Sequence, residues 1–457
     1  MRVHFIAIGG SAMHNLAISL KKKGYAVSGS DDEIFEPSKT RLANYGILPA
    51  VIGWDADRIT PDLDAVILGM HAREDNPELL KSKELGLKIY SYPEFLYEQS
   101  KHKKRIVIGG SHGKTTITSM ILHVLNYHKI PCDYMVGAQL EGFEVMVKLT
   151  EDAPFMVIEG DEYLTSPIDR RPKFHVYRPD IGIISGIAWD HINVFPTFEN
   201  YVEQFQIFAD MIPDEGTFIY CKEDENCCKI AEKRNHPQAV GYELPAYEIE
   251  NHTYYITDNG NRIPLQLFGK HNLLNMNAAR FACQTMGVSD AQFYEAIQRF
   301  KGASKRLELV RGNEYCAVYK DFAHSPSKLL ATIDAVKDTF ADRQLIACVE
   351  LHTFSSLTAE FLQEYKDTMN KADEAFVYFN PHTIAHKKLP PITEEMIYKA
   401  FNNKHIRVFQ DSKFLLDVLR SMDWKNKNLL LMSSGNFDGV DYEMLADEII
   451  MNKFTVK

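Results

Sequence analysis

The stretch RIVIGGSHGKTTIT, residues 105–118, decides the fold of this chain of 457 residues. Residues 105–108 predict a short apolar strand, and residues 109–113 predict a tight loop. A helix is expected from Lys114 onward, because apolar residues recur at helical spacing between Ile117 and Leu125. Strand, glycine-rich loop, Gly-Lys-Thr and helix together predict a phosphate cradle, in which backbone N–H groups and the helix N-terminus attract the anion.

The predicted cradle assigns roles to individual residues. Lys114 would reach the β- and γ-phosphates, and the Thr115 hydroxyl would ligate Mg²⁺. One position departs from the general pattern G-x-x-x-x-G-K-[ST], because Ile108 stands where the first glycine is expected. Gly-Lys-Thr alone is a weak signal, but the strand before it and the amphipathic helix after it favour a nucleoside triphosphate site.

The composition is typical of a globular protein of roughly three domains. Apolar residues make up 45% of the chain and charged residues 25%. The net charge of -11 argues against a nucleic-acid partner, which requires a basic face. Seven irregularly spaced cysteines indicate free thiols in a reducing compartment. The N-terminus has no signal-peptide pattern and no apolar run approaches a membrane span, so we expect a cytoplasmic protein without a membrane partner.

The first hundred residues begin with a strand–helix–strand unit. A strand over 3–8 leads through a loop at 9–13 into a helix, and a second strand covers 25–28. Ala7, Gly9 and Ala12 stand where a dinucleotide fingerprint has glycines, and Asp31 follows the second strand where it could meet a ribose hydroxyl. This degenerate pattern allows NAD, FAD, a UDP-sugar or only a tight turn. His71 follows a further strand, and a plain surface histidine explains it equally well.

Charged residues follow two later strands, at the ends where open α/β sheets bind ligands. Glu159 comes after the strand over 155–158, and Asp190 and His191 come after the strand over 181–185. A role on Mg²⁺ or the γ-phosphate is expected for Glu159 and His191. Asp161 and Glu162 are equally well explained as solvated loop charges.

The rest of the chain alternates again. Residues 217–268 predict short strands with a hairpin at 259–260, followed by helices from 269 to 284 and from 289 to 300. Asn272 and Asn275 are good helix caps, which is an alternative to a ligand role. From about residue 302, five strands alternate with helices to residue 451, including one helix over 357–369. This pattern predicts a parallel sheet with crossover helices.

Six motifs in order resemble the Mur ligase family, the ATP-dependent amide-forming enzymes of bacterial cell-wall assembly. They are GGSHGKTT at 109–116, EGDE at 159–162, DH at 190–191, GKHNLLN at 269–275, KRLE at 305–308 and DFAHSP at 321–326. The resemblance implies an α/β fold with three domains. These are a Rossmann-like UDP-N-acetylmuramate-binding domain at 1–102, a central P-loop ATPase domain at 103–302 and a C-terminal Rossmann-like domain at 303–457. The last would bind the peptide and close over ATP.

The resemblance also implies the site residues. The catalytic set is Lys114, Glu159, His191, Arg306 and His324. ATP would contact Gly110, Ser111, His112, Gly113, Lys114, Thr115, Thr116, His271, Asn272, Asn275, Arg306 and Asp321, where Asp321 binds the ribose or positions Arg306. Mg²⁺ would contact Thr115, Glu159 and His191. The UDP-sugar would contact Gly9, Gly10, Ser11, Ala12, Met13, Ser30, Asp31 and His71, and the peptide would contact His352 and Ser355.

Within the family, the chain resembles the ligases that act directly on UDP-N-acetylmuramate. The stretches 159–179 and 190–205 resemble the recycling ligases, which add the intact murein tripeptide L-alanyl-γ-D-glutamyl-meso-diaminopimelate. We favour this branch over the ligases that add L-alanine in primary synthesis. The expected partners are therefore small molecules, and the expected state is a monomer or weak homo-oligomer.

Two departures limit what the resemblance implies. Gln206 stands where several Mur ligases have a carbamylated lysine, so no modified lysine is expected. The loop ELHTFSS at 350–356 replaces the arginine-containing E-P-R-S-N loop of the recycling enzymes, which leaves the third peptide residue open. A non-catalytic nucleotide or UDP-sugar sensor is disfavoured because the catalytic set is complete. An NAD-dependent oxidoreductase is disfavoured because glycines are missing at positions 7 and 12.

Overall fold

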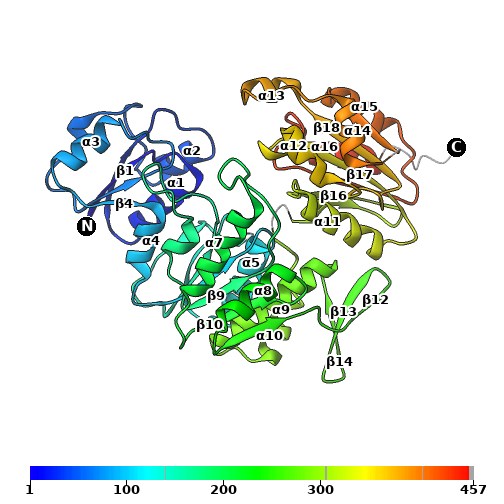
Figure 1. Ribbon diagram of the computed structural model, residues 1–457, viewed down its shortest axis with the longest axis horizontal. Coiled ribbons are helices and arrows are strands. Elements are labelled where there is room, and N and C mark those ends of the chain that lie inside the picture. Colours follow the sequence, from blue (N-terminus) through cyan, green and yellow to red (C-terminus); the bar gives the residue numbers. More distant parts are fainter. Residues whose placement is uncertain (139, 141, 304–305, 404, 452–457) are drawn as a thin grey trace. The chain divides into compact units, whose positions relative to one another are not determined.

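The computed structural model describes residues 1–138, 140, 142–303, 306–403 and 405–451 (Figure 1). The chain forms two compact units. The first unit consists of Met1–Ile187, Thr197–Glu243 and Asn275–Ile297, and the second of Ala188–Pro196, Leu244–Leu274 and Gln298–Lys457. No helix in the described part of the chain has the length and apolar character that a membrane-spanning segment needs.

The first unit begins with a four-stranded parallel sheet of order β2-β1-β3-β4. Its strands are β1 (Arg2–Ile6), β2 (Ala26–Ser30), β3 (Ala65–Leu68) and β4 (Ile89–Ser91). Its helices are α1 (Ser11–Lys22), α2 (Ser38–Asn44), α3 (Pro77–Glu84) and α4 (Tyr92–Ser100). Because all four strands are parallel, the loops after β1, β2 and β3 leave the sheet at one edge.

A seven-stranded sheet of order β11-β10-β9-β5-β8-β6-β7 completes the first unit, and only the β6–β7 pair is antiparallel. The strands are β5 (Lys104–Gly109), β6 (Cys132–Met135), β7 (Val147–Lys148), β8 (Phe155–Glu159), β9 (Ile181–Ile184), β10 (Thr217–Cys221) and β11 (Ala239–Tyr242). The helices are α5 (Lys114–Tyr127), α6 (Lys173–Val176), α7 (Phe198–Asp210), α8 (Glu225–Arg234), α9 (Lys270–Thr285) and α10 (Asp290–Ile297). The division between the units runs through α9. Ile106, Val107 and Ile108 are fully buried, as expected for a central parallel strand.

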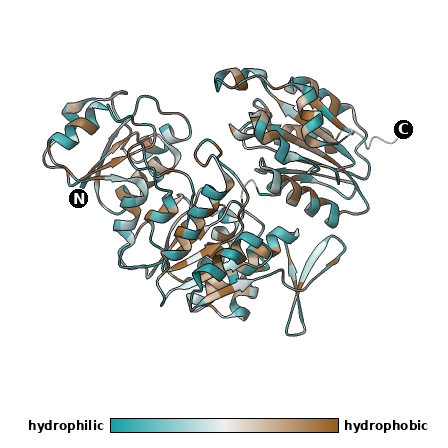
Figure 2. Ribbon diagram, in the orientation of Figure 1, coloured by the Kyte–Doolittle hydropathy of each residue, from teal (hydrophilic) through white to brown (hydrophobic). Residues whose placement is uncertain are grey.

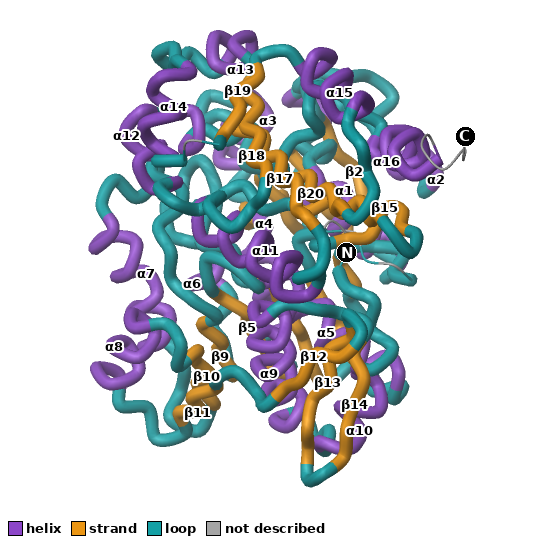
Figure 3. The backbone as a smooth tube through the Cα atoms, turned by 90° about the vertical axis from the view of Figure 1, so that its right-hand side faces the viewer, coloured by secondary structure: helices purple, strands orange, loops and turns teal. Residues whose placement is uncertain are grey.

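The second unit contains a six-stranded sheet of order β15-β16-β20-β17-β18-β19, whose last four strands lie side by side in Figure 3. The strands are β15 (Glu308–Gly312), β16 (Cys316–Asp321), β17 (Gln344–Leu351), β18 (Glu374–Phe379), β19 (Ile406–Phe409) and β20 (Lys427–Met432). The helices are α11 (Pro326–Thr339), α12 (Ala359–Leu362), α13 (Pro381–His386), α14 (Glu394–Phe401), α15 (Ser412–Ser421) and α16 (Tyr442–Met451).

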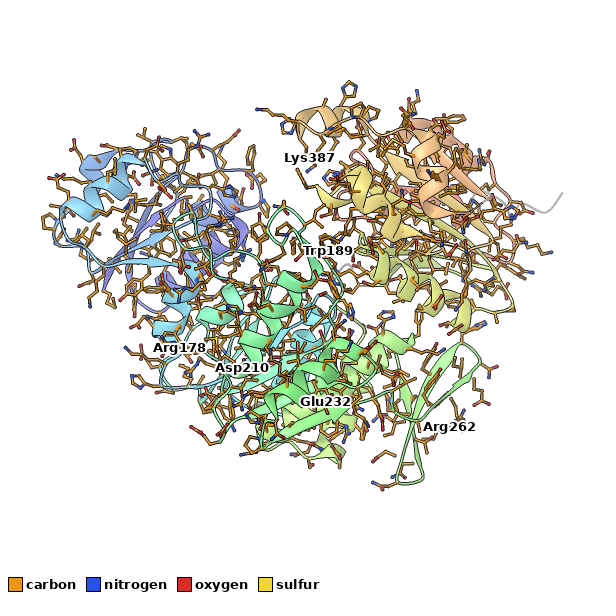
Figure 4. All side chains as sticks on the ribbon, in the orientation of Figure 1. Arg178, Trp189, Asp210, Glu232, Arg262 and Lys387 are labelled. Carbon is orange, nitrogen blue, oxygen red and sulfur yellow. The ribbon has the colours of Figure 1, made fainter. Side chains whose placement is uncertain are left out.

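The unit also contains an antiparallel sheet of β12 (Tyr247–Glu250), β13 (Thr253–Asp258) and β14 (Asn261–Leu265), on which Figure 4 labels Arg262. The predicted hairpin at 259–260 is therefore confirmed.

Helices cover both faces of the six-stranded sheet. Along β17, Ala347 and Val349 join the core with Ile333 of α11, whereas Cys348 joins the core with Leu445 of α16. This alternation follows from the two-residue period of a strand. Figure 2 shows hydrophobic residues concentrated along the strands. All seven cysteines are free.

Two details of the second unit differ from the sequence prediction. The expected helix over 357–369 is wrong, because short helical turns, η2 (Ser355–Leu357), α12 and η3 (Gln363–Tyr365), replace it. Thr358 has an extended backbone between η2 and α12. The side chain of Tyr365 is buried, and its hydroxyl donates a hydrogen bond to the His324 carbonyl. Strand β15 is antiparallel to β16, so the sheet is not wholly parallel. The domain boundaries at 102 and 302 stay a prediction.

Candidate active site

The loop between β5 and α5 forms the predicted cradle in the first unit. Gly110 and Gly113 have positive φ angles of 131° and 82°. A Cβ atom at Gly110 would lie 2.1 Å from Ser185 Oγ, and one at Gly113 would lie 2.4 Å from Asn275 Oδ1. Glycine is needed at both positions, because the backbone is left-handed and there is no room for a side chain.

The end of β9 fixes the backbone of this loop. The Ser111 N–H donates to the Gly186 carbonyl at 2.9 Å, and the Ser185 N–H donates to the Gly109 carbonyl at 3.1 Å. The Ser185 hydroxyl also donates to the His112 carbonyl. Thr116 is buried in the first turn of α5. The loop therefore has one defined conformation.

Lys114 at the start of α5 has two partners within the first unit. Its Nζ donates to the Gly110 carbonyl at 2.6 Å and to Glu162 Oε2 at 2.5 Å. Burial opposes the charge of Lys114, but the carboxylates of Glu162, Asp161 and Glu159 outweigh it and raise the pKa of Lys114. The side chain is therefore a cation beside the loop, as phosphate binding requires.

Thr115 and Glu159 form a second pair at the cradle. The Thr115 hydroxyl donates to Glu159 Oε1 at 2.7 Å, and the Gly137 N–H donates to Glu159 Oε2 at 2.7 Å. A carboxylate and a hydroxyl are oxygen ligands of the kind Mg²⁺ prefers, so these two residues fit that ion. His191 belongs to the second unit. Within the described residues, no three His, Cys, Asp or Glu side chains gather to hold a metal ion.

The two other acidic residues after β8 differ in exposure, because the Asp161 side chain is 38% exposed whereas Glu162 is buried, so the explanation as a solvated loop charge is wrong for Glu162 only. Asp161 accepts a hydrogen bond from Lys173 Nζ at 2.6 Å. Glu162 is 1% exposed, and its Oε1 accepts a hydrogen bond from the hydroxyl of Tyr201 on α7 at 3.1 Å. The sequence analysis missed Glu162 and Tyr201 as site residues. An acidic residue following Glu159 was a signal for the first, but no spacing connects Tyr201 with the loop.

The loop after β1 and the end of β2 meet in the first sheet. The Gly9 N–H donates to Asp31 Oδ2 at 2.6 Å, and the turn begins at Ala7, whose φ is +68°. Burial raises the pKa of Asp31 to about 6, against the hydrogen bond from Gly9. Gly10 caps α1, which begins with the candidates Ser11, Ala12 and Met13.

The two remaining UDP-sugar candidates have different surroundings. Ser30 is fully buried and donates to Glu78 Oε2. Glu78 Oε1 accepts from the Asp55 N–H at 2.9 Å, so Ser30 connects β2 with the loop before β3. His71 is exposed in the loop after β3.

Helix α9 contains the candidates expected near adenine. The helix begins at Lys270, so Asn272 and Asn275 are inside it, and their explanation as helix caps is wrong. Asn272 Nδ2 donates to the Phe268 carbonyl at 2.8 Å. Asn275 belongs to the first unit, where its Oδ1 lies beside Gly113, 2.4 Å from the position that a Cβ atom would occupy. His271 lies against Gly269.

The segment 188–196 belongs to the second unit and contains Trp189 (Figure 4). The His191 N–H donates to Asp190 Oδ1 at 2.8 Å, and Lys328 Nζ of α11 lies 3.6 Å from Asp190 Oδ2. Burial raises the pKa of Asp190, but Lys328, His191 and His324 outweigh it and lower this pKa to about 2. Asp190 therefore connects the segment to α11 as a carboxylate.

His324 follows β16 in the same unit. Its Nδ1 lies 2.7 Å from the Phe322 carbonyl, which can only accept, so Nδ1 carries the proton and Nε2 is the acceptor. Burial lowers the pKa of His324 to about 4, and Lys328 acts in the same direction. The ring is therefore neutral at physiological pH.

Asp321 at the end of β16 holds the backbone directly after Arg306. Its two carboxylate oxygens accept hydrogen bonds from the Leu307 N–H at 2.5 Å and the Ala323 N–H at 2.6 Å. The Arg306 guanidinium lies 4.8 Å from the centre of the Phe322 ring. Burial raises the pKa of Asp321, and the charge of Arg306 opposes this shift. These contacts favour the positioning alternative for Asp321.

The two peptide candidates follow β17. His352 Nδ1 lies 3.5 Å from Glu350 Oε1, and Glu350 Oε2 accepts from the Phe437 N–H at 2.8 Å. Ser355 is buried at the start of η2. Asp321 ends β16, and Glu350 and His352 lie at the end of β17, with β20 between these two strands. All three residues are therefore at the carboxyl edge of one sheet, where parallel sheets bind ligands.

The segments that contain these candidate residues match three domains of one known protein family. Residues 2–104 match the Mur ligase family catalytic domain, residues 108–283 the Mur ligase middle domain, and residues 305–435 the Mur ligase glutamate ligase domain. The UDP-N-acetylmuramate–L-alanine ligase of Sulfurihydrogenibium sp. is 33% identical over 79% of this chain and 78% of its own length. The chain belongs to the Mur ligase family.

Further Mur ligases are similar over two thirds of the chain or more. The UDP-N-acetylmuramate–L-alanyl-γ-D-glutamyl-meso-2,6-diaminoheptandioate ligase of Escherichia coli is 28% identical over 97% of this chain and 98% of its own. The crystal structure of the UDP-N-acetylmuramate-alanine ligase of Thermotoga maritima has a TM-score of 0.70 at 20% identity and covers 100% of both chains. That of a Neisseria meningitides ligase named for the tripeptide has a TM-score of 0.59 at 28% identity, and covers 66% of this chain and 98% of its own.

Membership confirms the coarser predictions. The protein has the α/β architecture of three Mur ligase domains, and it is an ATP-dependent, ADP-forming amide ligase acting on small molecules. The roles of individual residues stay predictions, which the contacts above make specific enough to test.

Proposed function

We propose that this Mur ligase joins the carboxyl group of UDP-N-acetylmuramate to the α-amine of L-alanyl-γ-D-glutamyl-meso-diaminopimelate, in the cytoplasm, as a step of peptidoglycan recycling. The observation that carries the proposal is the conformation of segment 163–174, which is part of the stretch 159–179 that resembles the recycling ligases. Leu164 pairs with Pro172 in an antiparallel bridge, and the Lys173 N–H donates to the Tyr163 carbonyl at 2.9 Å. The segment is therefore a closed loop directly after the acidic residues of the cradle.

The basic residues of this loop have fixed partners. Arg171 binds Asp169 with Nη2 at 2.6 Å from Oδ2, and Lys173 lies 5.8 Å from the centre of the Tyr163 ring. The E. coli ligase that is 28% identical over 97% of this chain is named for the proposed reaction.

The chemistry requires a carboxylate to attack the γ-phosphate of ATP. We assign Lys114 and Arg306 to neutralise the two anions, and the loop from Gly110 to Gly113 to orient the phosphates. Thr115 and Glu159 would hold Mg²⁺, which supplies positive charge to the phosphate oxygens. The product of this step is an acyl phosphate and ADP.

The amine then attacks the acyl carbon, and phosphate leaves. His324 is the residue we assign to the incoming amine, because its unprotonated Nε2 can accept a proton. Asp321 would position Arg306, His271, Asn272 and Asn275 would contact adenine, and His191 would contact the metal ion or phosphate. The loop from Gly9 to Met13 with Ser30, Asp31 and His71 would bind the UDP-sugar, and His352 and Ser355 the peptide.

Ligation of free L-alanine to the same acceptor is the second candidate. The relative at 33% identity is named for that reaction, which favours this alternative. The 350–356 loop, which lacks the arginine of the recycling enzymes, leaves the third residue of the peptide open.

Phosphate release distinguishes the two candidates. Purified protein receives ATP, Mg²⁺ and UDP-N-acetylmuramate, with L-alanine or the tripeptide in separate reactions. We expect release with the tripeptide, together with a product of the matching mass. Release with L-alanine alone would replace the proposal with the second candidate, and release with neither would reject both.

A further inference from the structure

A buried tyrosine connects the cradle loop with the counter-ion of Lys114. The hydroxyl of Tyr201 lies 2.8 Å from Ser111 Oγ and donates to Glu162 Oε1 at 3.1 Å. Since the Tyr201 proton points to the carboxylate, the Ser111 hydroxyl donates to the Tyr201 oxygen. The hydrogen bonds therefore run from Ser111 through Tyr201 to Glu162, whose other oxygen binds Lys114 at 2.5 Å.

All members of this chain of hydrogen bonds are shielded from water. Tyr201 is 0% exposed, Glu162 1% and Ser111 4%. The ring of Tyr201 packs edge-on against Phe205 at 5.2 Å, one turn further along α7. Hydrogen bonds to a charged group are stronger where water is excluded, and losing one leaves a buried carboxylate partly unsatisfied.

We propose that Tyr201 is a positioning residue for ATP binding. It fixes Ser111 in the cradle loop and orients the carboxylate of Glu162, and Glu162 in turn sets the position of Lys114. This inference rests on the proposed use of the cradle for ATP. Tyr201 itself would contact neither the nucleotide nor the sugar.

The donors of Lys114 show why this positioning affects ATP. An ammonium group has three N–H donors. The Gly110 carbonyl and Glu162 accept two of them, at 2.6 and 2.5 Å, which leaves one donor for a phosphate oxygen. Without the Tyr201 hydroxyl, Glu162 loses the hydrogen bond that orients its Oε1, so the carboxylate, Lys114 and the remaining N–H donor are less firmly directed.

Tyr201→Phe removes only the hydroxyl group, and Tyr177→Phe is a matched control. Tyr177 is also fully buried in the first unit, but its hydroxyl has no hydrogen-bond partner among the described residues. Calorimetric titration with Mg·ATP is expected to show about tenfold weaker binding for Tyr201→Phe, because a hydrogen bond to a charged group is lost. Tyr177→Phe is expected to bind like the wild type.

A turnover assay separates positioning from general destabilisation. The Tyr201→Phe enzyme should have a raised KM for ATP and an unchanged KM for the UDP-sugar. A change in both KM values, together with a larger drop in Tm than in Tyr177→Phe, would indicate a merely structural role and overturn the proposal.

Ser111→Ala alone keeps the proposal testable if Tyr201→Phe is unstable, because it should also weaken Mg·ATP binding, and the two variants together form a double-mutant cycle. Ser111→Ala breaks the same hydrogen bond from the loop side, so the two losses of Mg·ATP affinity should be clearly less than additive. Additive losses would reject the connection. Absence of Mg·ATP binding by the wild type would instead reject the cradle assignment, whereas wild-type binding with equal affinity in Tyr201→Phe would reject only the role of Tyr201.

Discussion

The half-buried histidine His324 makes the second unit sensitive to acid. In the unfolded chain its pKa is 6.5, and burial lowers the pKa to about 4 in the fold. Below pH 6.5 the unfolded chain therefore takes up a proton that the folded unit refuses. The stabilisation is complete above pH 6.5 and is lost as the pH falls from 6.5 to 4.

The magnitude follows from the two pKa values. Each pKa unit corresponds to about 1.4 kcal/mol, so the interval between 6.5 and about 4 is worth about 3.5 kcal/mol. This is an upper value, because the ring is half-buried and water screens its neighbours. The variant His324→Asn cannot take up this proton, and its amide N–H can replace the Nδ1–H donor to the Phe322 carbonyl. Its stability should therefore decline less between pH 7 and pH 4.

Tryptophan fluorescence can report on the second unit. The chain has three tryptophans, and two of them, Trp189 and Trp424, belong to that unit. Guanidinium titrations in a Trp54→Phe background at pH 7, 6, 5 and 4 would measure the unfolding free energy. The exposed His386→Asn is the control and should decline like the parent. Parallel curves for His324→Asn and its parent would refute the reasoning.

Two further substitutions test the first unit. The pKa of Asp31 is raised from 3.8 to about 6, so ionisation of this carboxyl group opposes folding as the pH rises through this interval. The variant Asp31→Asn should therefore raise the unfolding free energy at pH 7 by up to about 3 kcal/mol and give no gain near pH 4. It should also weaken UDP-sugar binding. Thermal and calorimetric measurements at both pH values would check this, and an unchanged stability at pH 7 would contradict it. Gly113→Ala should weaken Mg·ATP binding by at least about tenfold, because its Cβ would lie 2.4 Å from Asn275 Oδ1. Gly24 has a similar φ of +90° but open space around it, so the control variant Gly24→Ala should lose only about 1 kcal/mol of stability and keep its ATP affinity. Equal ATP affinity in Gly113→Ala and Gly24→Ala would contradict the steric argument.

Local signals in the sequence predicted much of the architecture. The strand at 105–108 and the helix from Lys114 were predictable because the apolar residues change their period at the glycine loop. The segment 357–369 was not, because its conformation depends on tertiary contacts. Tyr365 bonds to His324, and the Asp367 N–H donates to the Phe401 carbonyl, and neither contact leaves a periodic pattern.

The candidate site shows the same limit. Lys114, Thr115 and Glu159 were recognisable from a loop motif and from the end of a strand. Tyr201 was not, because its partner Ser111 is 90 residues away in the chain. Its spacing along α7 indicates only a buried aromatic residue, and a hydroxyl that bonds across two loops has no signature in a single sequence.

The partners of the three carboxylates around the cradle distinguish which of them is the best candidate for a metal ligand. Three acidic side chains beside a polyphosphate site would repel the ligand unless each has a compensating partner. Asp161 pairs with Lys173, and Glu162 pairs with Lys114.

Glu159 differs from both, because the contacts of the described residues give it only neutral donors, the Thr115 hydroxyl and the Gly137 N–H. Glu159 shares the charge of Lys114 with Glu162 and Asp161 but accepts no hydrogen bond from a cation among the described residues, so its charge is the one that a divalent cation can neutralise. This asymmetry supports Glu159, rather than Asp161 or Glu162, as the metal ligand among the three.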